Sequence, residues 1–306
     1  MLTIVEPGIA NTIQDAGRWG CQAFGVPVSG AMDVFALRAA NVLVDNSCDQ
    51  AALEIRTHIT MQTDLPHLLA VTGADARFQI NGRAMPMWMS VFARGGSLIE
   101  IAPTRGWVYL AAHGALDVPR VMGSQSTYAR GKFGGLDGRA LAAGDDIAIG
   151  APTIRELVSA VGRRASERVI AFVHRHHAVR VILGPHDHWF TPDAINALTH
   201  TEFVVTESAD RMGYRLRGAV LERRAGELIS CGVTFGAIQV PADGQPIILM
   251  ADHQTTGGYP IIATVISADI PLVAQRAPGE RLVFQIVEIE EAQRAWNECN
   301  QSLNSA

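Results

Sequence analysis

Residues 52–150 consist of short apolar or alternating runs, each bounded by turn-forming residues. Asn81-Gly82 stands between two of these runs, and this dipeptide is a strong signal for a two-residue β-hairpin. Alternating strand–helix units are absent from the segment, which argues against a doubly wound parallel sheet. The pattern therefore predicts an antiparallel barrel or sandwich. The clearest predicted strands in this segment cover residues 53–56, 68–72, 78–80, 98–101, 108–112 and 147–149.

Helical periodicity is confined to a few segments. The clearest is 31–44, where apolar residues recur at helical spacing and Ser29 is the predicted N-cap. Further helices are expected at 192–199, at 268–275 and from residue 288 onward. The remaining predicted strands cover 2–6, 179–183, 202–206, 227–231, 236–240, 246–251 and 281–287. The predicted fold class is mainly β with few helices.

The length of 306 residues suggests about two domains at roughly 150 residues each. Residues 151–178 interrupt the strand pattern and are the predicted linker. We expect domains at 1–160 and 161–306, a division that leaves room for strands exchanged between the two.

Charge and cysteine content limit the class of protein. The formal net charge is −5, so no global basic field would attract nucleic acid or an anionic membrane. No run of about 18 apolar residues is present, and the start of the sequence has no signal-peptide pattern. Four widely spaced cysteines without a CxxC pair indicate reduced thiols. We therefore expect a cytoplasmic protein.

Familiar cofactor and catalytic motifs are missing. The sequence has no phosphate-binding GxxxxGK[ST] loop, no GxGxxG after a strand, no GxSxG and no HExxH. Two histidine groups, 174–177 and 186–188, lack the i, i+4 spacing of a helical metal site, and we interpret them as surface histidines. The sequence predicts no metal centre.

Four segments dense in glycine and polar residues are the candidate functional sites. In the first, 12–33, tight turns bring Gln14, Asp15, Arg18, Ser29 and Asp33 together around a ligand, or else an Arg–Asp pair and a helix cap order the loop. In the second, the hydroxyls and amides of 123–128 and 134–139 form an anion nest, or else ordinary turns.

The third and fourth candidate segments lie in the second half. Arg211 and Arg215 flank a glycine in 208–216 and suit either a carboxylate or phosphate ligand or a structural salt bridge. In 236–260, a buried apolar strand at 247–251 delivers Asp252 and the following polar residues onto Gly257-Gly258. Polar residues held at the end of a rigid strand are well placed to contact a ligand, and we expect this segment to line the main cleft.

These segments carry a family resemblance over nearly the whole chain. The sequence resembles the KipA family, also called PxpC or allophanate hydrolase subunit 2, the second half of a carboxyltransferase domain. The resemblance implies two cyclophilin-like β-barrel domains and an obligate KipI/PxpB-like partner subunit. The motifs that carry it are, in order, QDAGRWG, GVPVSGAMD, GSQST, GGLDGR, SADRMGYRLRG, GAIQVPADGQPI and DHQTTGGYP.

The resemblance implies three alternative functions. The first is a subunit of an ATP-dependent 5-oxoprolinase, which opens 5-oxo-L-proline to L-glutamate together with KipI/PxpB-like and LamB/YcsF-like subunits. The second is transfer of CO₂ from carboxybiotin to urea, with the biotin carried on another protein. The third is non-enzymatic binding of a KipI-like partner. ATP would bind at a site that the sequence does not identify.

The matched motifs supply the predicted site residues. Two positions depart from the family pattern as the resemblance gives it: Ile261 follows GGYP and His253 stands where basic residues are frequent, which weakens the case for an anion contact there. The predicted catalytic residues are Gln14, Asp15, Arg18, Asp252, Gln254 and Thr255. The predicted substrate- or anion-binding residues are Ser29, Ser124, Ser126, Thr127, Arg211, Arg215, Gln239, Thr256, Gly257, Gly258 and Tyr259.

Overall fold

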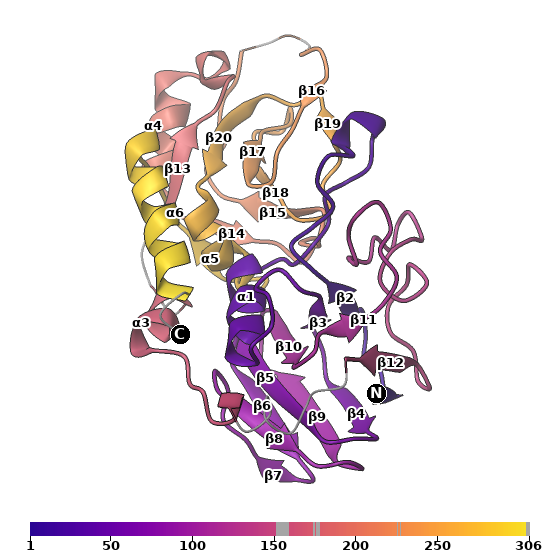
Figure 1. The fold of residues 1–306 in the computed structure, drawn as a ribbon. Coiled ribbons are helices and arrows are strands. Elements are labelled where there is room, and N and C mark those ends of the chain that lie inside the picture. The colour runs from indigo at the N-terminus through magenta and orange to yellow at the C-terminus, as the bar shows by residue number, and fades with distance from the viewer. Residues whose placement is uncertain (151–158, 174, 176–177, 225, 227, 304–306) are drawn as a thin grey trace. The chain divides into compact units, whose positions relative to one another are not determined.

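The computed structural model describes residues 1–150, 159–173, 175, 178–224, 226 and 228–303. The chain divides into two compact units (Figure 1). Unit 1 comprises Met1–Trp19, Ser29–His174 and Gln301–Ala306, and unit 2 comprises Gly20–Val28 and Arg175–Asn300. The predicted linker falls partly outside the described residues, but α3, Glu167–Val173, shows that its described part includes a helix.

Unit 1 contains two antiparallel sheets. Their strand orders are β11-β12-β1-β4-β9-β6-β7 and β2-β3-β10-β5-β8. Predicted strands at 2–6, 53–56, 68–72, 78–80, 98–101, 108–112 and 147–149 are confirmed within one or two residues. The strands of unit 1 are β1 Leu2–Glu6, β2 Thr12–Gln14, β3 Ala52–Ile55, β4 Ile59–Thr63, β5 His67–Gly73, β6 Ala76–Ile80, β7 Arg83–Ala84, β8 Ser90–Ala93, β9 Leu98–Pro103, β10 Val108–Ala112, β11 Leu116–Asp117 and β12 Asp146–Ile149.

The two sheets of unit 1 share one hydrophobic core. Ile4, Met61 and Ile99 come from the first sheet, and Leu53 and Leu110 come from the second. Because side chains alternate along a strand, the second sheet turns its other face away from this core. Helix α1, Val34–Leu43, packs against β5 and β10 of that sheet.

Helix α1 begins later than predicted. Its N-cap is Asp33, whose carboxylate accepts a hydrogen bond from Ala36 N at 2.9 Å, so the prediction of Ser29 as N-cap was wrong. The backbone of Ser29 has φ 55°, in the left-handed region. Residues 29–33 form an irregular segment that leads into the helix.

The predicted hairpin at Asn81-Gly82 is confirmed. Ile80 pairs with Arg83 across β6 and β7, and the two turn residues have φ 52° and 74°. Positive φ at both central positions is the requirement of a type I′ turn, which explains the Asn-Gly pair.

Unit 2 is built on an eight-stranded sheet in the order β21-β14-β15-β18-β17-β20-β13-β22. The edge strands β21 and β22 are separated in sequence by Val283 alone, so the sheet nearly closes into a barrel. All neighbouring pairs are antiparallel except β13 with β22. The strands of unit 2 are β13 Val179–Leu183, β14 Phe203–Val205, β15 Gly213–Arg217, β16 Cys231–Gly232, β17 Ala237–Gln239, β18 Ile247–Leu249, β19 Thr256–Gly257, β20 Ile261–Val265, β21 Arg281–Leu282 and β22 Phe284–Ile286.

The helices of unit 2 are near their predicted positions. They are α4 Pro192–His200, α5 Ile270–Ala274 and α6 Ile289–Leu303. Residue 227 of the strand predicted at 227–231 lies outside the described residues. Of residues 228–231, only Cys231 belongs to a strand, β16. Among the described residues, no helix is long and apolar enough to cross a membrane.

Candidate functional site

In unit 1, the edge of β2 is covered by the segment 124–127. Thr127 N donates to Ile13 O at 3.0 Å, and Asp15 N donates to the Ser126 hydroxyl at 3.0 Å. The structure therefore brings together Asp15, Ser124, Ser126 and Thr127, which the sequence placed in two separate candidate segments.

The carboxylate of Asp15 is buried and fully engaged. It accepts hydrogen bonds from Gly17 N at 2.8 Å, Gln125 N at 2.6 Å, the Ser124 hydroxyl at 2.7 Å and the Ser126 hydroxyl. A carboxylate with this many donors holds loops in place. The arrangement favours a positioning role, and a direct catalytic role for Asp15 stays a prediction.

Arg18 is completely buried and holds the same loop. Its Nε donates to Val121 O at 2.9 Å and one of its terminal nitrogens donates to Ser126 O at 2.8 Å. The guanidinium also lies 4.8 Å from the centroid of the Phe133 ring. Through these contacts the cation orders two main-chain carbonyls and lies against an aromatic ring.

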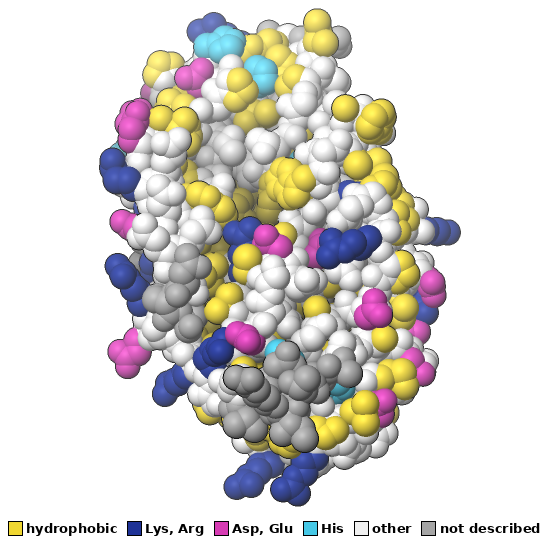
Figure 2. Space-filling view, in the orientation of Figure 1, with side chains coloured by type: hydrophobic (Ala, Val, Ile, Leu, Met, Phe, Trp, Pro, Cys, Tyr) yellow, Lys and Arg dark blue, Asp and Glu magenta, His cyan; other side chains and the backbone are white. Residues whose placement is uncertain are grey.

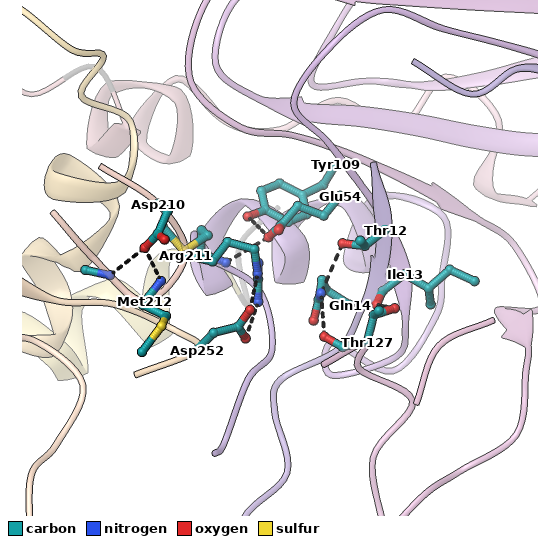
Figure 3. A network of polar contacts seen from close by, with 12 residues as sticks. Thr12, Ile13, Gln14, Glu54, Tyr109, Thr127, Asp210, Arg211, Met212 and Asp252 are labelled. Carbon is teal, nitrogen blue, oxygen red and sulfur yellow. Dashed lines mark hydrogen bonds and ion pairs between the residues drawn. The ribbon is translucent and has the colours of Figure 1, made fainter. Parts of the chain in front are cut away.

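A row of polar side chains crosses the face of the second sheet opposite the hydrophobic core. Thr12, Glu54 and Tyr109 occupy directly paired positions on β2, β3 and β10. Glu54 is fully buried and accepts hydrogen bonds from the Tyr109 hydroxyl at 2.7 Å and from Met32 N at 2.8 Å (Figure 3). The Tyr109 hydroxyl in turn accepts from Asp33 N at 2.8 Å. These bonds fix residues 29–33 over the sheet.

Burial, reinforced by the nearby Glu54 and Asp33 charges, raises the pKa of Tyr109 well above its usual value. Tyr109 therefore stays protonated and donates a hydrogen bond to Glu54. Neither residue was predicted from the sequence as part of a site. The available signal was a carboxylate inside the otherwise apolar strand Ala-Leu-Glu-Ile, because a charged residue in such a strand needs a partner.

Gln14 belongs to the same region, and we call Thr12, Gln14, Glu54 and Tyr109 the polar layer. Gln14 lies on the Thr12 side of β2, and its Nε2 donates to the Thr12 hydroxyl at 3.0 Å and to Thr127 O at 3.1 Å (Figure 3). Gln14 Oε1 and the Ser29 hydroxyl are buried and have no hydrogen-bond partner among the described residues.

In unit 2, Arg211 and Asp252 form a two-pronged ion pair. Arg211 Nε lies 2.9 Å from one carboxylate oxygen of Asp252, and a terminal nitrogen lies 3.0 Å from the other (Figure 3). Asp252 N also donates to Arg211 O at 2.7 Å. Of the two alternatives for Arg211, the structure shows the salt bridge. Arg215 lies on β15 at an exposed position, apart from this pair.

The strand before Asp252 is buried as predicted, with Ile248, Leu249 and Met250 shielded from solvent and Ile247 partly so. After it, His253 is buried, and burial lowers the pKa of its imidazole. His253 is therefore neutral near pH 7, and its Nδ1 lies 2.6 Å from Gln254 O.

Gln239 and Gln254 meet in unit 2. Gln254 Nε2 lies 3.5 Å from Gln239 Oε1, and Gln239 Nε2 donates to Tyr259 O at 3.4 Å. Gly257 pairs with Cys231 in the β16–β19 ribbon, and a Cβ at Gly257 would lie 2.5 Å from Gln239 Nε2. The glycine therefore leaves room for this amide. Thr256 and Tyr259 are exposed, and Thr255 O accepts from Val233 N at 3.1 Å.

Unit 2 also has a groove of about 520 Å³, which is formed by residues outside the predicted site. It lies between α6 and the β13–β20 strands, and hydrophobic side chains are exposed beside α6 in Figure 2. None of the predicted site residues lines this groove. Its lining residues are Ile182, Thr264, Val265, Ile266, Ser267, Ala292, Gln293, Trp296 and Asn297.

Metal ligands do not gather in the part of the chain that the structure describes: no group of three His, Cys, Asp or Glu residues is placed to hold an ion. His186 Nδ1 accepts from Ile261 N at 3.2 Å, whereas the His188 side chain is 62% exposed. His174, His176 and His177 lie outside the described residues.

Known proteins resemble this chain over nearly its whole length. The family model described as "Carboxyltransferase domain, subdomain A and B" matches residues 24–286. The sequence is 38% identical to the C subunit of 5-oxoprolinase from Escherichia coli, covering 96% of this chain and 94% of that protein. It is 35% identical to the corresponding 5-oxoprolinase protein of Haemophilus influenzae, covering 95% and 93%. The structure is similar to urea amidolyase of K. lactis with a TM-score of 0.90 at 25% identity, covering 99% of this chain and 20% of that one.

Proposed function

Because this chain belongs to the family of carboxyltransferase domains, subdomains A and B, we propose that it is the C subunit of a 5-oxoprolinase, which opens 5-oxo-L-proline to L-glutamate. The observation that carries the proposal is the 38% identity to the Escherichia coli protein across almost the full length of both chains. A match that extends from end to end supports a shared role more strongly than a match to one motif.

Both bacterial relatives are named as one subunit of an enzyme, which supports a further proposal, that the chain works in a complex. We propose KipI/PxpB-like and LamB/YcsF-like partners and a requirement for ATP. Hydrolysis of the lactam is uphill near neutral pH, and phosphorylation of the amide oxygen would make the carbon a better electrophile. We propose that ATP binds at a site that is not a phosphate loop, since the sequence contains no such loop.

The residues around Gln239 are our candidates for contact with the reacting amide. Gln254 and Thr255 follow the buried strand β18, and the amides of Gly257 and Gly258 lie on the same segment. Preorganised donors of this kind stabilise negative charge that develops on a carbonyl oxygen. Arg211 and Asp252 fix the start of the segment through their ion pair, so we assign them a positioning role.

We assign positioning roles as well to the residues that hold the loops around β2, which are Asp15, Arg18, Ser124, Ser126 and Thr127. We propose that three exposed residues, Arg215, Thr256 and Tyr259, contact a partner protein or a substrate carboxylate, because their side chains are accessible to solvent.

Reconstitution tests the function directly. The chain is mixed with its KipI-like and LamB/YcsF-like partners, and ATP hydrolysis is measured with and without 5-oxo-L-proline. We expect ATP turnover that depends on the lactam and on all three chains. ATP hydrolysis at the same rate with and without 5-oxo-L-proline would contradict the proposal.

A second candidate function is transfer of a carboxyl group from carboxybiotin to urea. The observation that favours it is the structural likeness to K. lactis urea amidolyase, of which this chain matches a fifth. The biotin would be carried by another protein. Isotope exchange from carboxybiotin into urea distinguishes this function, and binding of a KipI-like partner without either reaction would favour a purely regulatory protein.

We further propose that both domains are cyclophilin-like barrels with a boundary near residue 160, and that the protein acts in the cytoplasm. The nearly closed sheet of unit 2 supports the first point, and the free cysteines among the described residues support the second.

A further inference from the structure

The groove beside α6 takes no part in the proposed reaction, and its lining residues all belong to unit 2. Its volume of about 520 Å³ lies within the range of about 300–1,000 Å³ that is usual for small-molecule sites. One wall is residues 292–297 of α6, and the other is Ile182 of β13 with residues 264–267 at the end of β20 (Figure 1). Unit 2 alone therefore forms a cavity of the right size for a small ligand.

The groove is apolar at its floor and polar at its mouth. Val265 and Ile266 are buried, whereas Gln293, Trp296 and Asn297 are exposed on α6. An occupant of this groove would bury an apolar body against the floor and keep its polar atoms at the mouth. A flat heterocyclic ring has this division, because its faces are apolar and its edge carries the hydrogen-bonding atoms.

Four neutral polar side chains line the groove without a hydrogen-bond partner among the described residues: Thr264, Ser267, Gln293 and Asn297. Gln293 and Asn297 lie four residues apart on α6, so they share one face of the helix about 6 Å apart along its axis. Each amide offers a donor beside an acceptor. Such amides pair with a ring edge that also carries a donor beside an acceptor, as adenine does.

Charge at the groove favours an uncharged ligand. Among the described residues that line it, none is Asp, Glu, Lys, Arg or His. Arg180 precedes Ile182 on β13, but its guanidinium is held by the buried Asp269, with Nε at 2.9 Å and a terminal nitrogen at 2.8 Å from the two carboxylate oxygens. Glu291 lies 3.7 Å from the same guanidinium. Arg180 is therefore already neutralised and supplies no cation for a phosphate group.

We propose that this groove binds a neutral purine base or its nucleoside, with the ring against Trp296 and the polar edge of the ring at the amides of Gln293 and Asn297. Aromatic side chains stack on the face of a nucleobase, and the apolar floor covers the rest of the ring. The groove is distinct from the ATP site of the proposed function, because no lining residue among those described could hold the phosphates. The inference stands independently of that function.

Calorimetric titration of the full chain with adenosine, AMP and glucose tests the proposal. We expect adenosine to bind at one site per chain, AMP to bind no more tightly than adenosine, and glucose not to bind. Absence of adenosine binding would overturn the proposal. Binding of AMP at least about tenfold more tightly than adenosine would also overturn it, since that preference requires a cation at the site. Binding of glucose in place of adenosine would show a sugar site instead.

Variants on α6 locate the binding. Trp296→Ala removes the stacking face and should weaken adenosine binding by at least about tenfold, whereas Trp296→Phe keeps an aromatic ring and should retain most of it. Asn297→Asp keeps the shape of the side chain but replaces its donor with an acceptor, and we expect a loss of about tenfold. Arg294→Ala, at an exposed position of α6 outside the lining, is the matched control and should bind adenosine like the native chain.

Thermal melting of each variant separates recognition from folding. Asn297 is exposed, so Asn297→Asp should fold like the native chain and keeps the test decisive if Trp296→Ala is unstable. Native affinity for adenosine in either folded variant, Trp296→Ala or Asn297→Asp, would place the nucleoside elsewhere and overturn the proposal. None of these measurements involves 5-oxo-L-proline or its turnover, so their failure would leave the proposed function standing.

Discussion

Arg211 and Asp252 meet through two parallel hydrogen bonds of 2.9 and 3.0 Å, with their side chains only 15% and 10% exposed. Asp252 directly follows Met250-Ala251 at the end of the buried β18 region, and Arg211 lies two residues before the start of β15. Since β15 and β18 are neighbouring strands, the ion pair ties together the ends of two adjacent strands. It thereby fixes where the polar segment 252–259 begins.

The two-pronged geometry predicts that Arg211→Lys is not conservative. Lysine keeps the charge but offers no planar fork, so one of the two bonds to Asp252 is lost. We expect a loss of about 1–2 kcal/mol in the free energy of unfolding, measured by urea denaturation. Arg217→Lys, at an exposed position of β15, is the matched control and should change stability little. Equal stability of the Arg211→Lys and native proteins would contradict a role for the fork.

Gly257 and Gly258 provide a matched pair of substitutions. A Cβ at position 257 would lie 2.5 Å from Gln239 Nε2, whereas one at 258 would lie no closer than 3.4 Å to any neighbour. The side-chain amide of Gln239 can move aside, so Gly257→Ala should fold with nearly native stability but displace Gln239 from Gln254. We expect its lactam-dependent ATP turnover to fall at least about tenfold.

Gly258→Ala is the control for this prediction and should keep most of the turnover. Thermal melting of both variants checks that any loss reflects the site. Native turnover in Gly257→Ala would show that the Gln239–Gln254 contact has no part in the reaction.

Structure could be predicted from the sequence most accurately where it is decided by neighbouring residues. The Asn81-Gly82 turn follows from the backbone conformations of those two residues, and the burial of β18 follows from an uninterrupted apolar run. The N-cap of α1 was misplaced because Ser29 and Asp33 are both suitable capping residues. Which of them caps the helix depends on the contacts of Asp33 N with Tyr109, far along the chain.

The arrangement of the candidate sites depended on strand register, which the sequence did not reveal. Glu54 and Tyr109 become partners because β3 and β10 pair at those positions. Asp15 and Ser126 meet because 124–127 runs along β2, although the sequence singled out each of them separately. Arg215 was grouped with Arg211, but the alternation of side chains along β15 directs it to solvent.

Acidification should destabilise the protein through His67. Burial, followed by the nearby amino terminus, lowers the pKa of His67 to about 4, below the 6.5 expected in the unfolded chain. The unfolded state then binds more protons, so stability is full above pH 6.5 and falls as the pH drops towards 4. We expect a loss of roughly 1–3 kcal/mol across this window, after allowing for partial solvent screening.

Urea denaturation at pH 7.0, 5.5 and 4.5 measures this loss, and His67→Gln should flatten the dependence. His188→Gln, at a 62% exposed position, serves as the control and should keep the native profile. An identical pH profile in native and His67→Gln proteins would assign the acid sensitivity to other groups.

Tyr109→Phe tests whether the polar layer of unit 1 is a structural unit. The substitution removes the hydroxyl that donates to Glu54 at 2.7 Å and accepts from Asp33 N at 2.8 Å. It leaves a buried carboxylate with one donor fewer, which costs more than the lost hydrogen bond alone. We expect about 2–4 kcal/mol of destabilisation by urea denaturation.

Because the pKa of Tyr109 is raised by burial and by Glu54, the tyrosine stays protonated and the native protein should show no loss of this contribution up to pH 9. The double variant Tyr109→Phe with Glu54→Gln, which removes the buried charge, should recover part of the lost stability. If Tyr109→Phe is as stable as the native chain, then Glu54 has other donors that suffice and the Tyr109 hydroxyl does not organise residues 29–33.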